Sequence, residues 1–311
     1  MNFGDSDLTK RSYSAVSEFE ERIKRALYPG NVNFERIERM DPDRMQKLLL
    51  WRVISKECSF DSSIWFDAKS GAGIMLNEED EIRLFCIREN YSLDNAYKTA
   101  SELRYSIKKN EFGILFNNDL GYLNRSIYNI GTGMRASVMI GLPFLTITGN
   151  IGETKKLLRS KGLMLRGNSG EGSAADRFYY QLSNISCACC GEKECIGVVK
   201  YGVEIASYYE KRAMRKCENG KAEFAVLFKN ALRRLYTTDQ IDNTLLNELL
   251  VLTNIAEKLG LIKTDIRDYE KLYLKLRNSL KTNGNIFEET KRSIDAEYVK
   301  EVIEKEIKID L

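Results

Sequence analysis

Hydrophobic periodicity changes along the chain near residue 192, and this change decides the fold class that we expect. Before it, short apolar runs typical of strands are mixed with segments of helical spacing. After it, glycine and proline are rare and apolar residues recur at helical spacing, as in LLNELLVLTNIAEKLGLI at 245–262. We therefore expect an α+β fold, with a largely antiparallel sheet flanked by helices, followed by an all-helical C-terminal domain.

Element boundaries follow from turn and capping residues. The pair Asn219-Gly220 indicates a turn between domains, so we expect one domain at 1–210 and a helical domain at 221–311. The expected helices lie at 13–27, 43–53, 92–108 and 153–160. The expected strands lie at 72–76, 82–87, 111–116, 135–141, 163–166 and 178–182.

Composition excludes several kinds of chemistry. The 311 residues include no histidine, which rules out a Ser-His-Asp triad, a Cys-His dyad and an HExxH zinc site. The sequence also has no GxxxxGK[ST] phosphate loop. Proton transfer would therefore use a carboxylate, lysine, tyrosine or cysteine. A net charge of +3 with interspersed signs gives no indication of nucleic-acid binding.

The same sequence predicts the compartment. Its N-terminus is polar and no apolar run reaches the length of a membrane span, so we expect a cytoplasmic protein with no membrane partner. The seven cysteines fit a reducing environment. Four of them are clustered in CACCGEKEC, at Cys187, Cys189, Cys190 and Cys195. This cluster lacks the second arm of a usual zinc site, so incidental or redox-sensitive thiols are the first interpretation and a metal site is the alternative.

Three short segments combine tight turns with arginines. NEEDEIR at 77–83 places four acids between two expected strands, and RSIYNIGTGMRASVM at 125–139 carries a small-residue loop before an arginine. LRGNSGEGS at 165–173 leaves a strand into a glycine-rich loop. Taken alone, the first fits a solvated acidic turn and the last a mobile surface turn. Taken together, arginines held at different strand ends can converge on one polyphosphate.

These segments carry a resemblance to a known family. NEEDEIR resembles the NEEDx[IL]R segment of the ATP:guanidino phosphotransferases, which include creatine and arginine kinases. The loop at 125–139 resembles their CP[ST]NxGTx[LIM]RASV segment, and RGNSGEGSAADRFYYQLSN resembles RGxxGE…SN. Their order and spacing agree from about Glu18 to Asn184. The details are most similar to the bacterial protein-arginine kinases.

The resemblance implies an antiparallel sheet that binds MgATP opposite a guanidinium. It implies ATP and Mg²⁺ as cofactors and a protein arginine as the substrate. The residues that it places at the nucleotide are Arg83, Arg135, Arg166 and Asn129. The residues that it places at the guanidinium are Glu79 as holding group and base, Glu78 as its support, Glu171 as second carboxylate and Ser126.

Four departures from the family pattern concern activity. Ser126 stands where the family has a cysteine whose thiolate supplies negative charge. Glu81 and Gly141 stand where the family has histidines. The family's arginine-rich strand SSRxRxxRN has no counterpart before the first helix, so we expect an N-terminally shortened catalytic domain. In protein-arginine kinases the helical domain binds phosphoarginine with an Arg and an Asp, and Asn254 and Leu252 align there.

Three hypotheses follow from the sequence. The first is an active guanidino kinase acting on protein arginine. The second is a degenerate pseudokinase that binds a nucleotide or a regulatory protein partner. The third is a metal or redox module centred on Cys187–Cys195. Helix-rich C-terminal domains often dimerise, so a homodimer is a further expectation.

Overall fold

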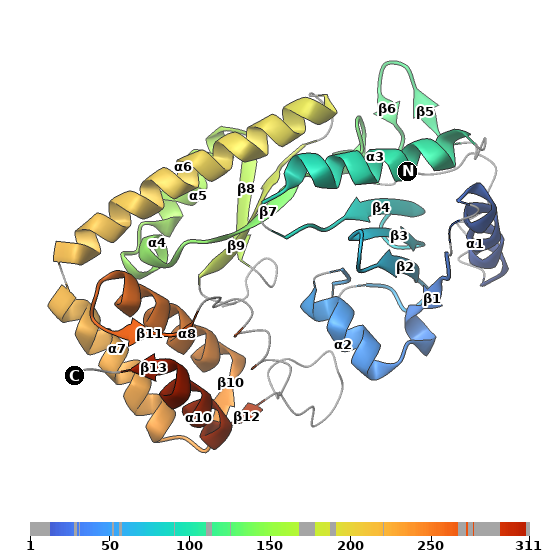
Figure 1. The fold of residues 1–311 in the computed structure, drawn as a ribbon. Helices are drawn as coiled ribbons and strands as arrows, with labels where there is room; N and C mark the ends of the chain where they lie inside the picture. The colour runs from blue at the N-terminus through green and yellow to red at the C-terminus, as the bar shows by residue number, and fades with distance from the viewer. Residues whose placement is uncertain are drawn as a thin grey trace. The chain divides into compact units, whose positions relative to one another are not determined.

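The computed structural model describes most of the chain (Figure 1). By its internal contacts the chain divides into two compact units, one made of Met1–Val138 with Asn184–Val199 and the other of Met139–Ser183 with Lys200–Leu311. This division by contacts does not test the boundary between domains that the sequence predicts at 210–221, which stays a prediction. The described residues are 13–27, 30, 32–51, 53–55, 58–89, 91–109, 114–124, 126–167, 178–186, 191–219, 221–266, 272, 276 and 293–308.

The first unit is built on a four-stranded antiparallel sheet in the order β1-β2-β3-β4. Strand β3 lies inside the sheet, since β2 and β4 pair with its two edges, and all five of its residues are buried. The elements of this unit are α1 (Tyr13–Ala26), β1 (Glu35–Arg36), η1 (Ile37–Arg39), α2 (Pro42–Leu50), β2 (Ser63–Asp67), β3 (Ala72–Leu76), β4 (Ile82–Cys86), α3 (Leu93–Lys109), β5 (Phe116–Asn117), β6 (Gly121–Tyr122) and η2 (Ile127–Asn129).

Apolar residues from two helices and two strands form the core of this unit. Helix α3 packs against β3 and β4, and α1 packs against α3 (Figure 1). Burial of these side chains supplies the main favourable free energy of folding for this unit. The buried cluster consists of Val16, Phe19 and Ile23 from α1, Ile74 and Leu76 from β3, Ile82 from β4 and Ile107 from α3.

A polar contact joins α3 to the start of α6 (Glu192–Asn219), whose first residues belong to this unit. The Tyr97 hydroxyl donates to Glu192 Oε2 at 2.6 Å, and the Arg104 guanidinium forms a two-pronged ion pair with the same carboxylate. The hydrogen bond to Glu192 raises the pKa of Tyr97. Such forked pairs fix orientation as well as adding stability, so this contact holds the first residue of α6 against α3.

The second unit combines a small sheet with helices. Its three-stranded sheet has the order β7-β9-β8, and the first residues of β7 and the last residue of β9 belong to the first unit. Two short antiparallel ladders, β10-β12 and β11-β13, accompany the C-terminal helices. The elements are β7 (Ser137–Gly141), α4 (Pro143–Ile147), α5 (Ile151–Ser160), β8 (Leu163–Gly167), β9 (Tyr179–Asn184), the rest of α6, α7 (Lys221–Tyr236), β10 (Gln240–Asp242), α8 (Asn243–Lys258), β11 (Lys263–Thr264), β12 (Ser293–Asp295), α10 (Ala296–Glu306) and β13 (Ile307–Lys308).

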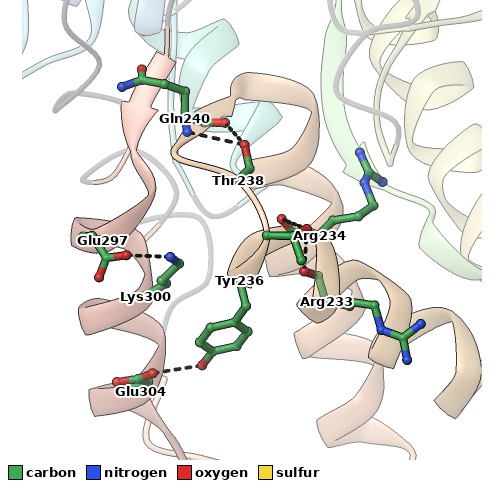
Figure 2. A network of polar contacts seen from close by, with 9 residues as sticks. Arg233, Arg234, Tyr236, Thr238, Gln240, Glu297, Lys300 and Glu304 are labelled. Carbon is green, nitrogen blue, oxygen red and sulfur yellow. Dashed lines mark hydrogen bonds and ion pairs between the residues drawn. The ribbon is translucent and has the colours of Figure 1, made fainter.

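Polar side chains connect the end of α7 with α10. Figure 2 shows Tyr236 directed toward α10, where its hydroxyl donates to Glu304 Oε1 at 3.0 Å. The Lys300 ammonium lies 5.9 Å from the centre of the Tyr236 ring and 2.6 Å from Glu297 Oε1. Burial and the nearby Glu304 carboxylate raise the pKa of Tyr236. These contacts add to the packing of α7 against α10.

The α+β class predicted from the sequence is confirmed. Strands β3, β4, β7, β8 and β9 coincide with expected strands to within two residues at either end. Of the strand expected at 111–116, only Phe116 belongs to a strand, and residues 111–113 lie outside the described ones. Where the structure describes it, the C-terminal region is mainly helical but contains four short strands that the helical periodicity did not predict. Among the described residues, no helix is long and apolar enough to span a membrane.

Candidate active site

The acidic segment forms the tight connection between β3 and β4. Asn77 starts it in the left-handed region, at φ 57°, which asparagine tolerates better than most residues. Its backbone N–H donates to Glu81 O at 3.0 Å, and the N–H of Glu78 donates to Asp80 O at 3.2 Å. The Ser62 hydroxyl donates to Asn77 O at 2.9 Å, which fastens the turn to the sheet. The carboxylates of this turn therefore start from a fixed backbone.

Two of the predicted residues meet beside this turn. Arg83, on β4, donates from Nη1 to Glu78 Oε2 at 2.9 Å. The Glu78 side chain is 16% exposed and that of Arg83 is 43% exposed, so the carboxylate lies inward and the guanidinium faces outward. The guanidinium also lies 5.9 Å from the centre of the Phe85 ring. Glu78 thus holds Arg83, a contact that the sequence did not predict, while Glu79 is exposed.

The central loop is linked to the acidic turn. Ser126 precedes η2, and its backbone carbonyl accepts from the N–H of Asn129 at 3.0 Å. The Asn129 side chain reaches the turn, where Nδ2 donates to Asp80 Oδ2 at 2.9 Å. The carbonyl of Asn129 accepts a hydrogen bond from Asn124 Nδ2. Asp80 was not among the residues selected from the sequence, although it lies within the NEED motif.

Glycines allow the strand before this loop to approach it closely. Gly121 has φ 77°, and a Cβ there would lie 2.3 Å from the carbonyl oxygen of Gly131. The neighbouring Tyr122 N–H donates to that same oxygen at 2.8 Å. Gly131 and Gly133 also have positive φ, at 108° and 60°. The positive φ angles of these glycines and the lack of a side chain at Gly121 allow this close backbone contact.

Arg135 follows this loop as an exposed residue, separated from the start of β7 at Ser137 by one residue. The Met134 N–H donates to Thr132 Oγ1 at 3.3 Å, which orders the backbone just before it. The buried Ala136 follows it. Arg135 thus stands on an ordered backbone with its side chain accessible to solvent.

The remaining predicted residues are placed differently. Arg166 lies on β8 in the second unit, where its Nε donates to Met164 Sδ at 2.7 Å. Glu171 lies outside the described residues, as do Cys187, Cys189 and Cys190. In the first unit the structure therefore brings together Glu78 and Arg83 and, through Asp80, the loop with Asn129.

Comparison with known proteins decides the family. Residues 14–213 match the sequence profile described as "ATP:guanido phosphotransferase, C-terminal catalytic domain", which is well over half of the chain. The chain belongs to this family. The family transfers phosphoryl groups between ATP and guanidino groups, as the resemblance of the three segments had indicated.

Curated relatives and solved structures agree with the family assignment. The protein-arginine kinase of Syntrophomonas wolfei is 35% identical over 169 residues, which cover 54% of this chain and 46% of that protein. The one of Clostridium tetani is 36% identical over 184 residues, covering 58% and 54%. The chain spans about half the length of the curated relatives that it matches.

Structural likeness extends to phosphagen kinases. A lombricine kinase crystal structure matches with a TM-score of 0.55 at 22% identity, covering 64% of this chain and 60% of that one. The duplicated taurocyamine kinase of Schistosoma mansoni, with bound transition state analog components, matches with a TM-score of 0.56 at 20% identity, covering 70% and 34%. At these identities the likeness shows the fold alone.

The residues at this turn fit a polyphosphate. A guanidinium carries five N–H donors, and the hydrogen bond from Arg83 to Glu78 uses one of them and leaves donors for a second oxyanion. Across the part of the chain that the structure describes, no three Cys, Asp or Glu side chains are grouped to hold a metal ion. Magnesium commonly binds through substrate phosphates with only one or two carboxylates, so the turn still fits it.

A buried cysteine, Cys58, lies near the acidic turn. Cys58 is buried, and its Sγ lies 4.0 Å from Met75 Sδ. Burial raises the pKa of the Cys58 thiol, and the Glu78 carboxylate adds to the rise while Ser62 and Arg83 oppose it. Cys58 is therefore a neutral thiol and cannot replace the thiolate that the family has at the position of Ser126.

Proposed function

We propose that this guanido phosphotransferase binds MgATP through Arg83 and Arg135 and transfers the γ-phosphoryl group to the guanidinium of a protein arginine. The observation that carries the proposal is the hydrogen bond between Asp80 and Asn129. This hydrogen bond links the acidic turn to the loop that precedes Arg135, so the carboxylates of the turn and the arginine of the loop can act in one site. The bacterial protein-arginine kinases among the relatives support protein arginine as the substrate.

Each residue has a chemical task in this proposal. Arg83 and Arg135 neutralise phosphate oxygens, and bound Mg²⁺ would add to this neutralisation. Glu79 is exposed on the turn, where its carboxylate orients the guanidinium and accepts its proton. A guanidinium nitrogen attacks the γ-phosphorus, the bond from this phosphorus to the bridging oxygen breaks, and ADP leaves with that electron pair. The roles expected for Arg166 and Glu171 remain predictions.

A specific observation favours a second candidate. Ser126 is neutral where the family has a thiolate, and Cys58 is held neutral by burial. A site that lacks this negative charge binds the nucleotide but orients a guanidinium poorly. The second candidate is therefore a pseudokinase that binds MgATP and regulates a protein partner.

One experiment separates the two candidates. The chain is incubated with labelled ATP, magnesium and an arginine-rich protein, and acid-labile label on arginine is measured. The proposal predicts labelling that the Glu79→Gln variant loses, because the carboxylate base is then absent. Saturable MgATP binding with no labelling would favour the pseudokinase, and labelling that survives in Glu79→Gln would contradict the assigned base.

A further inference from the structure

One buried side chain holds the backbone on both sides of Arg135. Asn184, the last residue of β9, is 7% exposed. Its Oδ1 accepts from the N–H of Ala136 at 2.8 Å, and its Nδ2 donates to Met134 O at 3.2 Å. The residue between these two contacts is Arg135. The asparagine amide thus pairs with this segment as a neighbouring strand would.

The hydrogen-bonding capacity of this amide is well used. Besides Met134 O, Nδ2 donates to the carbonyl of Ser186 at 3.1 Å, so both amide hydrogens have acceptors. The flanking groups also fix its orientation, because Ala136 N–H needs an acceptor and Met134 C=O needs a donor. In a buried place such a network is expensive to break.

Arg135 differs from Asn184 in its exposure to solvent. Its backbone is held by Asn184 on both sides, while the residue is exposed. An arginine that is exposed while its backbone is fixed on both sides is pre-organised to reach a ligand. Simple packing of the sheet would not require polar contacts to both neighbours of one exposed residue.

We propose that Asn184 is a positioning residue, which orients the Arg135 guanidinium toward the phosphates of a bound nucleoside triphosphate. This inference rests on the proposed function, since it needs MgATP at Arg135. In this proposal Asn184 affects the nucleotide through the backbone that carries Arg135 and not by a contact of its own. Its contribution therefore depends on the forked guanidinium at that position.

The test is a double-mutant cycle on the dissociation constant for MgATP, measured by titration calorimetry. Asn184→Leu is made in the native chain and in Arg135→Lys, which keeps a charge but lacks the fork whose direction matters. We expect about tenfold weaker binding in the native chain, the size of one lost charged hydrogen bond. In the Arg135→Lys background we expect at most about a threefold loss, because little orientation is left to lose.

A matched control separates orientation from stability. Thr253 is buried on α8, where its hydroxyl donates to Leu249 O at 2.7 Å, so Thr253→Val also removes one buried hydrogen bond. This variant should lower thermal stability and leave MgATP affinity unchanged. If Asn184→Leu shows no cooperative thermal transition, Asn184→Asp replaces it, because it keeps the acceptor for Ala136 and lacks the donors.

The outcomes distinguish this inference from the proposed function. No saturable MgATP binding by the native chain would overturn both. Saturable binding with equal losses from the Asn184 variant in the two backgrounds would overturn the positioning role alone. An equal loss of affinity in Thr253→Val would also overturn it, because general destabilisation would then explain the effect.

Discussion

The hydrogen bond between Asp80 and Asn129 can be measured directly by a double-mutant cycle. Asn129→Ala removes only the side-chain contact at 2.9 Å, since its backbone N–H to Ser126 O and its carbonyl to Asn124 remain. Hydrogen bonds to ionised groups contribute about 1.5–3 kcal/mol. Both partners are partly exposed, so we expect a coupling free energy of about 1–2 kcal/mol after screening by solvent.

The assay is urea unfolding of the native chain, Asp80→Ala, Asn129→Ala and the double variant. The expected result is that the double variant loses less stability than the sum of the two single variants, by the coupling free energy. Asn95→Ala serves as the control, because its side chain donates to the nearby Ser92 Oγ and should be additive with Asp80→Ala. Additivity of the Asp80 and Asn129 variants to within about 0.5 kcal/mol would refute the link between turn and loop.

Four further predictions follow from individual contacts. Gly121→Ala should destabilise the chain by about 2–3 kcal/mol because of its positive φ and backbone clash, whereas Gly149→Ala, with φ 71° and open space, should cost only about 1 kcal/mol; urea unfolding of both compares them. Glu192→Gln should lower the free energy of unfolding by about 1–2 kcal/mol, since it weakens the forked contact to α3, and an unchanged midpoint would refute this. Burial raises the pKa of Glu210 above its usual 4.5, so folding favours its neutral form: that contribution is fully present below pH 4.5 and is lost as pH rises through the raised value. Unfolding measured across this range should therefore show a smaller decline in Glu210→Gln than in the native chain. Ser126→Cys should increase arginine labelling in the transfer assay if a thiolate is what the site lacks, and no gain would refute that explanation.

The sequence predicted most of the fold because local patterns agree with tertiary packing. Strand β3 reads as a continuous apolar run, and its central position in the sheet is consistent with burial of all five residues. The strands of the C-terminal region were not predicted, since β10 and β12 are only three residues long and each runs directly into the helix that follows it. Such short pairings are decided by tertiary contacts rather than by periodicity.

The candidate site was predicted as segments but not as contacts. The motifs located Glu78, Arg83, Asn129 and Arg135, because their residue types and spacing carry the family signal. The sequence did not show that Glu78 would hold Arg83. It also gave no sign that Asn184 would bracket Arg135, since 49 positions separate the two and the contact depends on how the strands pair. Long-range side-chain to backbone contacts of this kind have no local sequence pattern.

The central claim is that the acidic turn and the loop form one site for MgATP. Titration of MgATP into the native chain, Arg83→Met and Arg88→Met tests it most directly. Arg88 is also an exposed arginine of the first unit, just after β4, but its guanidinium donates to Thr99 Oγ1 at 3.1 Å. We predict saturable binding that Arg83→Met weakens by about tenfold or more and that Arg88→Met leaves unchanged. No saturable binding by the native chain, or equal losses in both variants, would contradict the claim.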